Sequence, residues 1–328
     1  MLIYAGIDEA GYGPMFGPMV VACSVLTLED LDPGTEAPDL WQRLHTTVRR
    51  DGRGRRDRIQ VNDSKKLYTP AKGLARLEEG VLAFAALGGL RPANLAQWLE
   101  GLGECPEEGR LAQMPWYAPC SDRPWDPLPS ACTGDQITIV ASMLRTAARV
   151  AAVRSLQPRA AVVFEDQFNQ MVTTMRSKAA MSFTFVARHL AHLWNEHGLS
   201  HPLVVVDRQS GRRNYRELLA MMFEAVEIQV LEENPRRSAY FLRHGERAMT
   251  VRFEVEAEMA HMPVALASMT AKYTRELLMA RFQAWFKQRA PHIRPTAGYA
   301  TDARRFREEI EPVLGELAID TKRLVRMA

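Results

Sequence analysis

The sequence predicts an α/β fold in which a sheet is covered by helices. Apolar runs of strand length, at 2–7, 19–28 and 203–206, alternate with segments of helical periodicity such as 135–156 and 264–288. Hydrophobic residues make up 47% of the chain and charged residues 25%, which is ordinary for a protein with a packed core. The 328 residues are enough for one large domain or two ordinary ones.

The chain opens with a strand, a glycine-rich turn and a second strand. The strands are expected at 2–7 and 19–28, and the glycines and prolines of 11–18 supply the turn. The run at 19–28 is continuously apolar, which is typical of a strand buried on both faces. It is followed by an expected irregular charged segment at 30–62, a helix at 70–80 and a strand at 81–87.

The rest of the chain alternates between helices and strands after a long ordered loop. That loop is expected at 101–134, which is rich in proline, glycine and isolated aromatic residues. The elements that follow are expected as helix 135–156, strand 160–164, helix 170–197, strand 203–206, helix 215–224, strand 225–231, hairpin 239–256, helix 264–288 and a mostly helical end.

Composition excludes several classes of protein. No apolar run reaches the roughly 18 residues of a membrane span, and the acids that follow at once on the first apolar run argue against a signal peptide. The four cysteines lie far apart, so we expect no disulfide framework and a cytoplasmic location. The net charge is only +3, but arginines cluster at 49–58 and 208–216, which either contact phosphate or form solvated loops.

Acidic residues follow two of the predicted strands. Asp8 and Glu9 come directly after 2–7, and Asp207 comes directly after 203–206. Sites in α/β sheets are built at such strand ends. Glu276 shares a stripe of helix 264–288 with Ser268 and Lys272, so a helix packed on the sheet can aim it at the same place.

Converging carboxylates need a cation, because like charges a few ångströms apart repel strongly. Oxygen ligands favour Mg²⁺ or Mn²⁺, and two such ions are a standard device for cleaving phosphodiesters. The alternative is that each acid is a separate surface group, since spacing in the sequence alone does not show that they converge.

Four motifs, in order along the chain, resemble those of the type 2 ribonucleases H, the ribonuclease HII family. Residues 7–18 are similar to its opening signature D-E-A-G-R-G-P-x-x-G-P, and 62–67 to its D-S-K-K-L element. Residues 265–276 resemble its A-A-A-S-I-x-A-K-V-T-R-D helix, and 298–301 its G-Y-P-T element. Residues 100–200 have no counterpart in these motifs.

The resemblance implies a ribonuclease H-like mixed sheet flanked by helices, with a long central insertion and a C-terminal helical region. It implies a catalytic domain at 1–290, with the inserted segment at about 100–200, and a helical extension at 291–328 that packs on this domain. We expect a monomer with no membrane association.

The resemblance also implies a metal-dependent endonuclease. It cleaves the RNA strand of RNA–DNA hybrids, or cleaves at single ribonucleotides in duplex DNA, and leaves a 5′-phosphate. The implied catalytic and metal-binding residues, which would hold two Mg²⁺ or Mn²⁺ ions, are Asp8, Glu9, Asp207 and Glu276. Asp166 is the alternative to Asp207, which we prefer because a basic loop follows it and it precedes the final strand and helix.

The same resemblance implies a set of substrate-binding residues. The backbone of the glycine motif would approach the ribose, whose 2′-OH separates RNA from DNA, and Tyr299 would stack on the sugar at the cleavage junction. The expected substrate-binding residues are Gly11, Tyr12, Gly13, Ser64, Lys65, Lys66, Lys272 and Tyr299.

Three positions depart from the family pattern and suggest a divergent member. Tyr12 stands where the family has arginine, Glu276 where it has aspartate, and Ala300 where it has proline. Two alternatives therefore stay open: a nucleic-acid-binding protein without catalysis on the same fold, and a related nuclease for another nucleic acid, such as branched DNA.

Two further hypotheses are weaker. A dinucleotide site at 11–17 needs a helix after the glycines, and a strand is expected there. A zinc site has only spacing in its favour, because histidines at such positions are more often surface or core-edge residues. The histidines concerned are His189, His192, His197 and His201.

Overall fold

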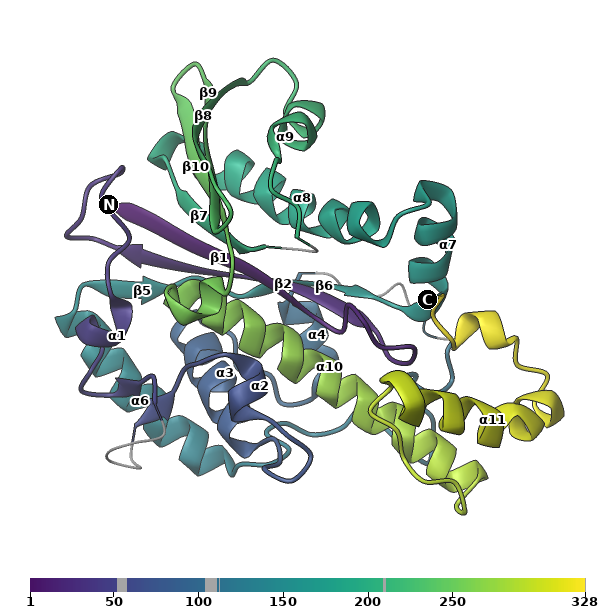
Figure 1. The fold of residues 1–328 in the computed structure, drawn as a ribbon. Coiled ribbons are helices and arrows are strands. Elements are labelled where there is room, and N and C mark those ends of the chain that lie inside the picture. The colour runs from purple at the N-terminus through teal and green to yellow at the C-terminus, as the bar shows by residue number, and fades with distance from the viewer. Residues whose placement is uncertain (52–57, 104–110, 112, 209–210, 328) are drawn as a thin grey trace.

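The computed structural model describes residues 1–327 except 52–57, 104–110, 112 and 209–210, so the middle of the arginine cluster at 49–58 lies outside the described residues. A mixed eight-stranded sheet forms the centre of the described part (Figure 1). Its order is β5–β2–β1–β7–β10–β9–β8, and β6 also pairs with β2. The strands are β1 Leu2–Ala10, β2 Met19–Leu28, β5 Val153–Ser155, β6 Arg159–Val163, β7 Leu203–Asp207, β8 Glu227–Glu233, β9 Arg237–His244 and β10 Arg247–Glu254.

The three central strands β1, β7 and β10 run parallel, whereas all other neighbours in the sheet pair antiparallel. Ile7 of β1 lies opposite Val206 of β7, and Asp207 lies opposite Glu254 of β10. The carboxyl ends of these strands therefore meet at one edge of the sheet, which is where α/β proteins place their sites.

Residues of β1 alternate between two hydrophobic cores, as the period of a strand requires. Leu2 and Tyr4 belong to one core, while Ile3, Ala5 and Ile7 belong to the other. All five side chains are buried. Both faces of the sheet are thus covered, which explains why β1 and β2 are apolar without alternation.

The first face of the sheet carries the long helix α10 and the helices around it (Figure 1). α10 lies across β1 and β2 and also packs on α3. The helices that contribute buried residues to this core are α1 Leu40–Arg43, α2 Ser64–Leu67, α3 Ala75–Leu87, α4 Leu95–Gly101, α6 Gly134–Val150, α10 Met262–Arg289 and α11 Ala300–Glu316. A two-stranded sheet of β3 Val48–Arg49 and β4 Ile59–Gln60 adjoins them.

The second face is covered by three helices that the chain forms between β6 and β8 (Figure 1). They are α7 Glu165–Met175, α8 Lys178–His197 and α9 Arg216–Met222. His189 of α8 is buried against the sheet, where its Nε2 lies 3.0 Å from the Val21 carbonyl oxygen. Burial lowers the pKa of His189 to about 4, so this ring is a neutral core residue. Short 3₁₀ turns complete the fold: η1 Gly198–Ser200, η2 Ala257–Met259 and η3 Thr321–Arg323.

The start of α10 lies directly on β1. A Cβ atom built on Gly6 would stand 2.2 Å from both Pro263 C and Val264 N, which no side chain tolerates. Only glycine at position 6 allows this approach. The contact places the first turn of α10 against Gly6, which is two residues before Asp8 on β1. The next turns of the helix therefore lie near the acids.

The predicted α/β sheet covered by helices is confirmed, and so are the strand at 19–28, the hairpin turning after His244 and the long late helix. The strand expected at 81–87 is wrong, because these residues form the second half of α3. A short apolar run fits a buried helix as well as a strand, and α3 is buried nearly all round.

Asp8 and Glu9 lie within β1 and not after it. The boundary at 290 and the insertion at about 100–200 stay predictions. Among the described residues, no helix has the length and apolar character needed to cross a membrane.

Candidate active site

Five carboxylates line a single pocket of about 110 Å³ at the carboxyl ends of the parallel strands, and four of them come from these strands or from the turn after β10. Asp8 and Glu9 come from β1, Asp207 is the last residue of β7, and Glu258 lies in the turn η2 between β10 and α10. The remaining lining residues are Ala10, Asp63, Ser64, Lys65, Ser268, Lys272 and Tyr299. The sheet and the start of α10 thus bring together groups from separate parts of the chain.

Two of these carboxylates are held in place by hydrogen bonds. The Ser268 hydroxyl donates to the Asp8 carboxylate, and Ser64 and Ser268 share a further hydrogen bond with 3.0 Å between their Oγ atoms. The backbone N–H of Ala257 donates to Asp207 Oδ1 over 3.0 Å. These contacts orient the acids before any ligand binds.

The pKa values of the pocket acids show the cost of placing them together. Burial, followed by the charges of Glu9 and Asp207, raises the pKa of Asp8 well above its ordinary value. Burial and the charge of Glu258 raise the pKa of Asp207 to about 7. Protons or cations must therefore offset the negative charge of this pocket at neutral pH.

Two lysines lie beside the acids. Burial disfavours the charged form of Lys65, but the carboxylates of Asp63, Asp8, Glu258 and Asp207 outweigh it and raise the lysine pKa. Lys272 Nζ donates to Glu276 Oε1 over 2.5 Å and lies 4.8 Å from the centre of the Tyr68 ring. Both lysines line the pocket, so they can meet an anionic substrate that enters it.

The donor set fits a hard divalent cation. All five acids of the lining offer carboxylate oxygens, which Mg²⁺ and Mn²⁺ prefer, and the lining contains no cysteine or histidine. Asp63 already accepts from the Lys65 backbone N–H through its Oδ1, over 3.0 Å, which leaves Asp8, Glu9, Asp207 and Glu258 as the candidate ligands. Within the described part of the chain, no three Asp, Glu, His or Cys side chains are close enough together to form a ready-made metal site. Burial, and after it the repulsion between neighbouring carboxylates, raises the pKa values of Asp8 and Asp207, so both effects oppose bringing charged carboxylates closer together.

The first strands of the chain also match a known family. Residues 5–33 match the family model of ribonuclease HII. The chain resembles ribonuclease HII. The matched stretch covers most of β1, the glycine-rich loop and β2, and it includes Asp8 and Glu9. Among curated proteins, none matches the sequence.

Solved structures of ribonucleases of this type are similar to the chain at low identity. A chain of the PCNA:RNase HII complex from Archaeoglobus fulgidus is 16% identical, with a TM-score of 0.43 over 99% of this chain and 94% of that one. The ribonuclease H2 of Pyrococcus horikoshii OT3 is 16% identical, with a TM-score of 0.45 over 98% and 92%. Bst-RNase HIII in complex with Mn²⁺ is 13% identical, with a TM-score of 0.42 over 99% and 66%.

Glu276, the fourth acid expected from the resemblance to ribonuclease HII, does not line the pocket. Its Oε1 accepts from Lys272 and lies 3.6 Å from Arg275 Nη1, and its carboxylate also bonds to Tyr68. Glu276 is two helical turns beyond Ser268, which is about 12 Å along the helix axis. Ser268, Lys272 and Glu276 do share one side of α10, as the sequence predicts, but only Ser268 and Lys272 line the pocket.

Glu258 takes the fourth place instead, and the sequence reasoning missed it. The signal was available, since Glu258 follows β10 closely, much as Asp8 and Asp207 follow their apolar runs. The pattern at 239–256 predicts a hairpin, but it does not indicate that β10 also runs parallel to β7. Because β10 does so, the segment after it is delivered to the same edge of the sheet.

The other expected residues divide into two groups. Ser64, Lys65, Lys272 and Tyr299 line the pocket, whereas Lys66 points its Nζ at Met259 Sδ, 2.9 Å away. The residues of the glycine motif, namely Gly11, Tyr12 and Gly13, lie in the loop just beyond Ala10 and outside the pocket lining. Asp166, the alternative third ligand, lies in the first turn of α7 and not in the pocket.

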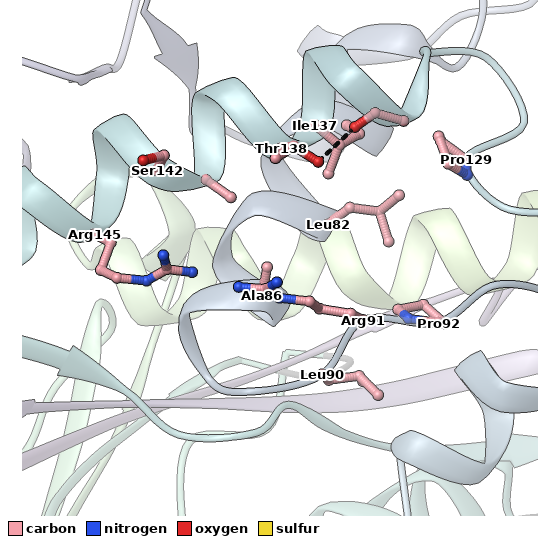
Figure 2. A pocket seen from close by; sticks show the side chains of 12 residues that line it. Leu82, Ala86, Leu90, Arg91, Pro92, Pro129, Ile137, Thr138, Ser142 and Arg145 are labelled. Carbon is pink, nitrogen blue, oxygen red and sulfur yellow. Dashed lines mark hydrogen bonds between the residues drawn. The ribbon is translucent and has the colours of Figure 1, made fainter.

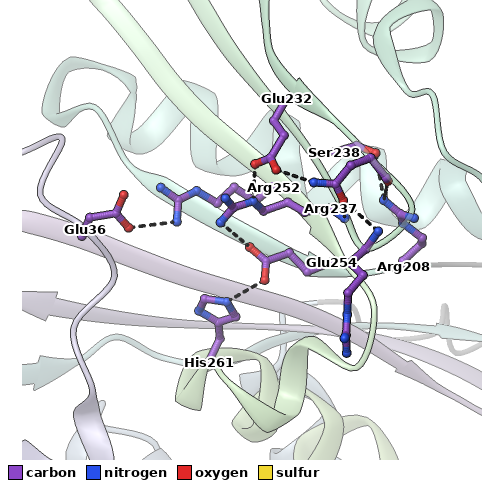
Figure 3. Close-up of polar contacts among 10 residues, drawn as sticks. Glu36, Arg208, Glu232, Arg237, Ser238, Arg252, Glu254 and His261 are labelled. Carbon is purple, nitrogen blue, oxygen red and sulfur yellow. Dashed lines mark hydrogen bonds and ion pairs between the residues drawn. The ribbon is translucent and has the colours of Figure 1, made fainter.

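A polar network supports the segment that carries Glu258 (Figure 3). His261, just before α10, places Nε2 3.0 Å from Glu254 Oε2 and Nδ1 2.5 Å from Tyr4 Oη. His261 thus bridges β10 and β1 through its two ring nitrogens. Arg237 bonds to Glu232 and lies 3.9 Å from Glu254. The segment 255–261 is thus tied at both ends to the sheet.

A second cavity, of about 260 Å³, lies between α3 and α6 and shares no lining residue with the acid pocket (Figure 2). Leu82, Leu90 and Ile137 give it apolar walls, and the side chains of Arg91 and Arg145 border it. None of the residues expected to act in the site lines this cavity, so we leave it out of the candidate site.

Proposed function

We propose that the chain is a metal-dependent endonuclease of the ribonuclease H type, which cleaves the RNA strand of RNA–DNA hybrids or cleaves at ribonucleotides in duplex DNA and leaves a 5′-phosphate. The observation that carries the proposal is the convergence of Asp8, Glu9, Asp207 and Glu258 on one pocket at the strand ends. The raised pKa values of Asp8 and Asp207 support it, because burial and the neighbouring carboxylates disfavour the charged form of these groups, and a divalent cation would favour it.

Asp8, Glu9, Asp207 and Glu258 would hold Mg²⁺ or Mn²⁺. When bound, two such ions supply an activated water and stabilise the leaving oxygen of the phosphodiester. Ser268 and the Ala257 N–H keep Asp8 and Asp207 in orientation. Lys65 and Lys272 would contact the phosphate that carries the cleaved bond.

The ribose would be recognised beside the pocket. Tyr299 is 46% exposed and lines the pocket, so its ring is accessible to a sugar. The loop with Gly11 and Gly13 follows β1 directly after the acids, and its backbone is the part that would approach a 2′-OH. Glu276 would act indirectly in this scheme, by fixing Lys272 through their ion pair.

A cleavage assay tests the proposal. Four substrates are compared in Mg²⁺, in Mn²⁺ and in EDTA: duplex DNA with one ribonucleotide, a long RNA–DNA hybrid, duplex DNA alone, and a branched DNA. We expect metal-dependent cleavage of the ribonucleotide-containing duplexes, no cleavage of DNA alone, and loss of activity in Asp8→Asn with the fold retained. Binding of the duplexes without cleavage under any condition would favour the nucleic-acid-binding alternative. Cleavage of branched DNA alone would favour the other nuclease.

A further inference from the structure

Residues at the C-terminal end of the described chain make hydrogen bonds to the backbone of the glycine-rich loop, residues 11–18, on its inner side. Arg326 Nε donates to the Pro14 carbonyl over 2.8 Å, and its Nη2 donates to the carbonyls of Pro14 and, over 3.2 Å, of Tyr12. The backbone N–H of Arg326 donates to Met15 O over 2.8 Å. A single residue near the end of the chain thus binds the loop backbone at three positions.

Two more buried side chains add to this support, and the Met15 N–H donates to the Gly298 carbonyl over 2.7 Å. Arg275 Nη2 donates to Phe16 O over 2.9 Å, and Gly17 N–H donates to Glu165 Oε1 over 3.0 Å. Gly17 has φ +85°, and a Cβ there would stand 2.3 Å from Met279 Sδ, so the position requires glycine. Arg275 is 1% exposed, so it reaches the loop from the protein interior.

The end of the chain is itself fixed on α7. Asn169 Nδ2 donates to the carbonyls of Lys322 and Val325, each over 2.8 Å, and Asn169 Oδ1 accepts from Met327 N–H over 2.7 Å. The guanidinium carbon of Arg326 lies 4.3 Å from the centre of the Phe168 ring. Arg326 therefore has a fixed position from which to hold the loop.

The inward direction of these carbonyls determines which groups of the loop face outward. In a trans peptide, the C=O of one residue and the N–H of the next point to opposite sides. The Tyr12 carbonyl points at Arg326, so the Gly13 N–H points away from it. Gly13 is exposed, a Cβ there would meet nothing within 4 Å, and its N–H has no partner among the described residues.

We propose that Arg326 is a positioning residue for substrate: by holding the carbonyls of Tyr12 and Pro14 inward, it presents the Gly13 N–H to the sugar–phosphate backbone of a ribonucleotide-containing duplex. This inference rests on the proposed function. Arg326 does not replace the arginine that the family has at position 12, because it is only 3% exposed and acts behind the loop.

The experiment compares Arg326→Met, Arg326→Lys and a matched control, Arg323→Met. Methionine keeps apolar contact with Phe168 and removes every side-chain donor, whereas lysine keeps a donor group. Arg323 lies in the same tail, is exposed, and has no side-chain partner within the described residues. The first readout is hydrogen–deuterium exchange of a peptide covering 11–18 in metal-free protein. The second is KM and kcat for duplex DNA with one ribonucleotide, together with Kd for the same duplex in EDTA.

We expect faster loop exchange in R326M than in wild type, an intermediate rate in R326K and no change in R323M. KM and Kd should rise about tenfold in R326M, the factor that one lost hydrogen bond corresponds to, while kcat stays within about threefold. Unchanged exchange in R326M, or faster exchange with unchanged KM and Kd, would overturn the proposal. If R326M does not fold, the same comparison is made with R326K: unchanged loop exchange, or faster exchange with unchanged KM and Kd, would overturn the proposal. Absence of cleavage by wild type would count against the proposed function alone, because exchange and Kd still test the role of Arg326.

Discussion

The buried carboxyl group of Glu165 predicts a pH-dependent stability. Glu165 is fully buried under the glycine-rich loop, where it accepts from Gly17 N–H and from Tyr117 Oη. Burial raises its pKa from 4.5 to about 7, although these hydrogen bonds and the charge of Arg326 oppose the rise. Folding therefore favours the protonated form of this side chain.

The sign and size of the effect follow from linkage. A carboxyl group whose pKa is raised by folding stabilises the protein fully below the unfolded pKa, and this contribution is lost as pH rises through the folded pKa. Between about pH 4.5 and pH 7 the wild type should lose about 3 kcal/mol through Glu165, since each pKa unit corresponds to about 1.4 kcal/mol. Glu165→Gln removes the titration and keeps an oxygen for Gly17 and Tyr117.

Urea unfolding of wild type and Glu165→Gln at pH 4.5 and pH 8, in EDTA, measures this contribution. The amide that the substitution introduces adds a constant cost at both pH values, so the quantity of interest is the change in the difference between the two proteins. We expect that difference to shift by about 3 kcal/mol in favour of Glu165→Gln at pH 8. An equal difference at both pH values would refute the reasoning, because it would mean that Glu165 titrates alike in the folded and unfolded chain.

Three further predictions concern other parts of the molecule. Gly6→Ala should destabilise the fold by about 3 kcal/mol or more in urea unfolding, because its Cβ meets the backbone of α10, whereas Gly13→Ala should change stability by less than about 0.5 kcal/mol; equal effects would contradict the close approach of helix and strand. Asp166→Asn should keep cleavage activity and Asp207→Asn should lose it, since only Asp207 lines the pocket, and the reverse result would reassign the third acid. Tyr12→Arg should tighten duplex binding and steepen the slope of log Kd against log salt by about one, as one added phosphate contact does; an unchanged slope would place residue 12 away from the phosphate backbone.

The sheet and its long helix could be predicted because their sequence patterns are strong. The apolar runs of β1, β2 and β7 have strand length, and α10 has 28 residues, which is far longer than a strand. The prediction of a strand at 81–87 was wrong because these residues are buried on nearly every side of α3. Their apolar pattern therefore has no periodicity that would distinguish a helix from a strand. The rule that acids collect at strand ends found Asp8, Glu9 and Asp207, all of which line the pocket.

The features of the site that could not be predicted from the sequence depend on tertiary structure. Glu258 enters the site because β10 pairs parallel with β7, and the paired residues, such as Leu203 and Thr250, are 47 positions apart in the chain. Glu276 was placed from its face of the helix, but a face does not give the distance along the axis. The hydrogen bonds from Arg326 to the glycine-rich loop join residues more than 310 positions apart. No pattern in the neighbouring sequence indicates such a contact.

The central claim is that Asp8, Glu9, Asp207 and Glu258 form one metal-dependent nuclease site, and the pair Glu258→Gln and Glu276→Gln tests it most directly. Each substitution removes one negative charge and keeps the size of the side chain. The measurement is the rate of cleavage, in Mg²⁺ and in Mn²⁺, of duplex DNA that contains a single ribonucleotide. We expect Glu258→Gln to lower the rate at least about 100-fold, and Glu276→Gln to lower it less than about tenfold. Full activity in Glu258→Gln, or loss in Glu276→Gln alone, would contradict the account.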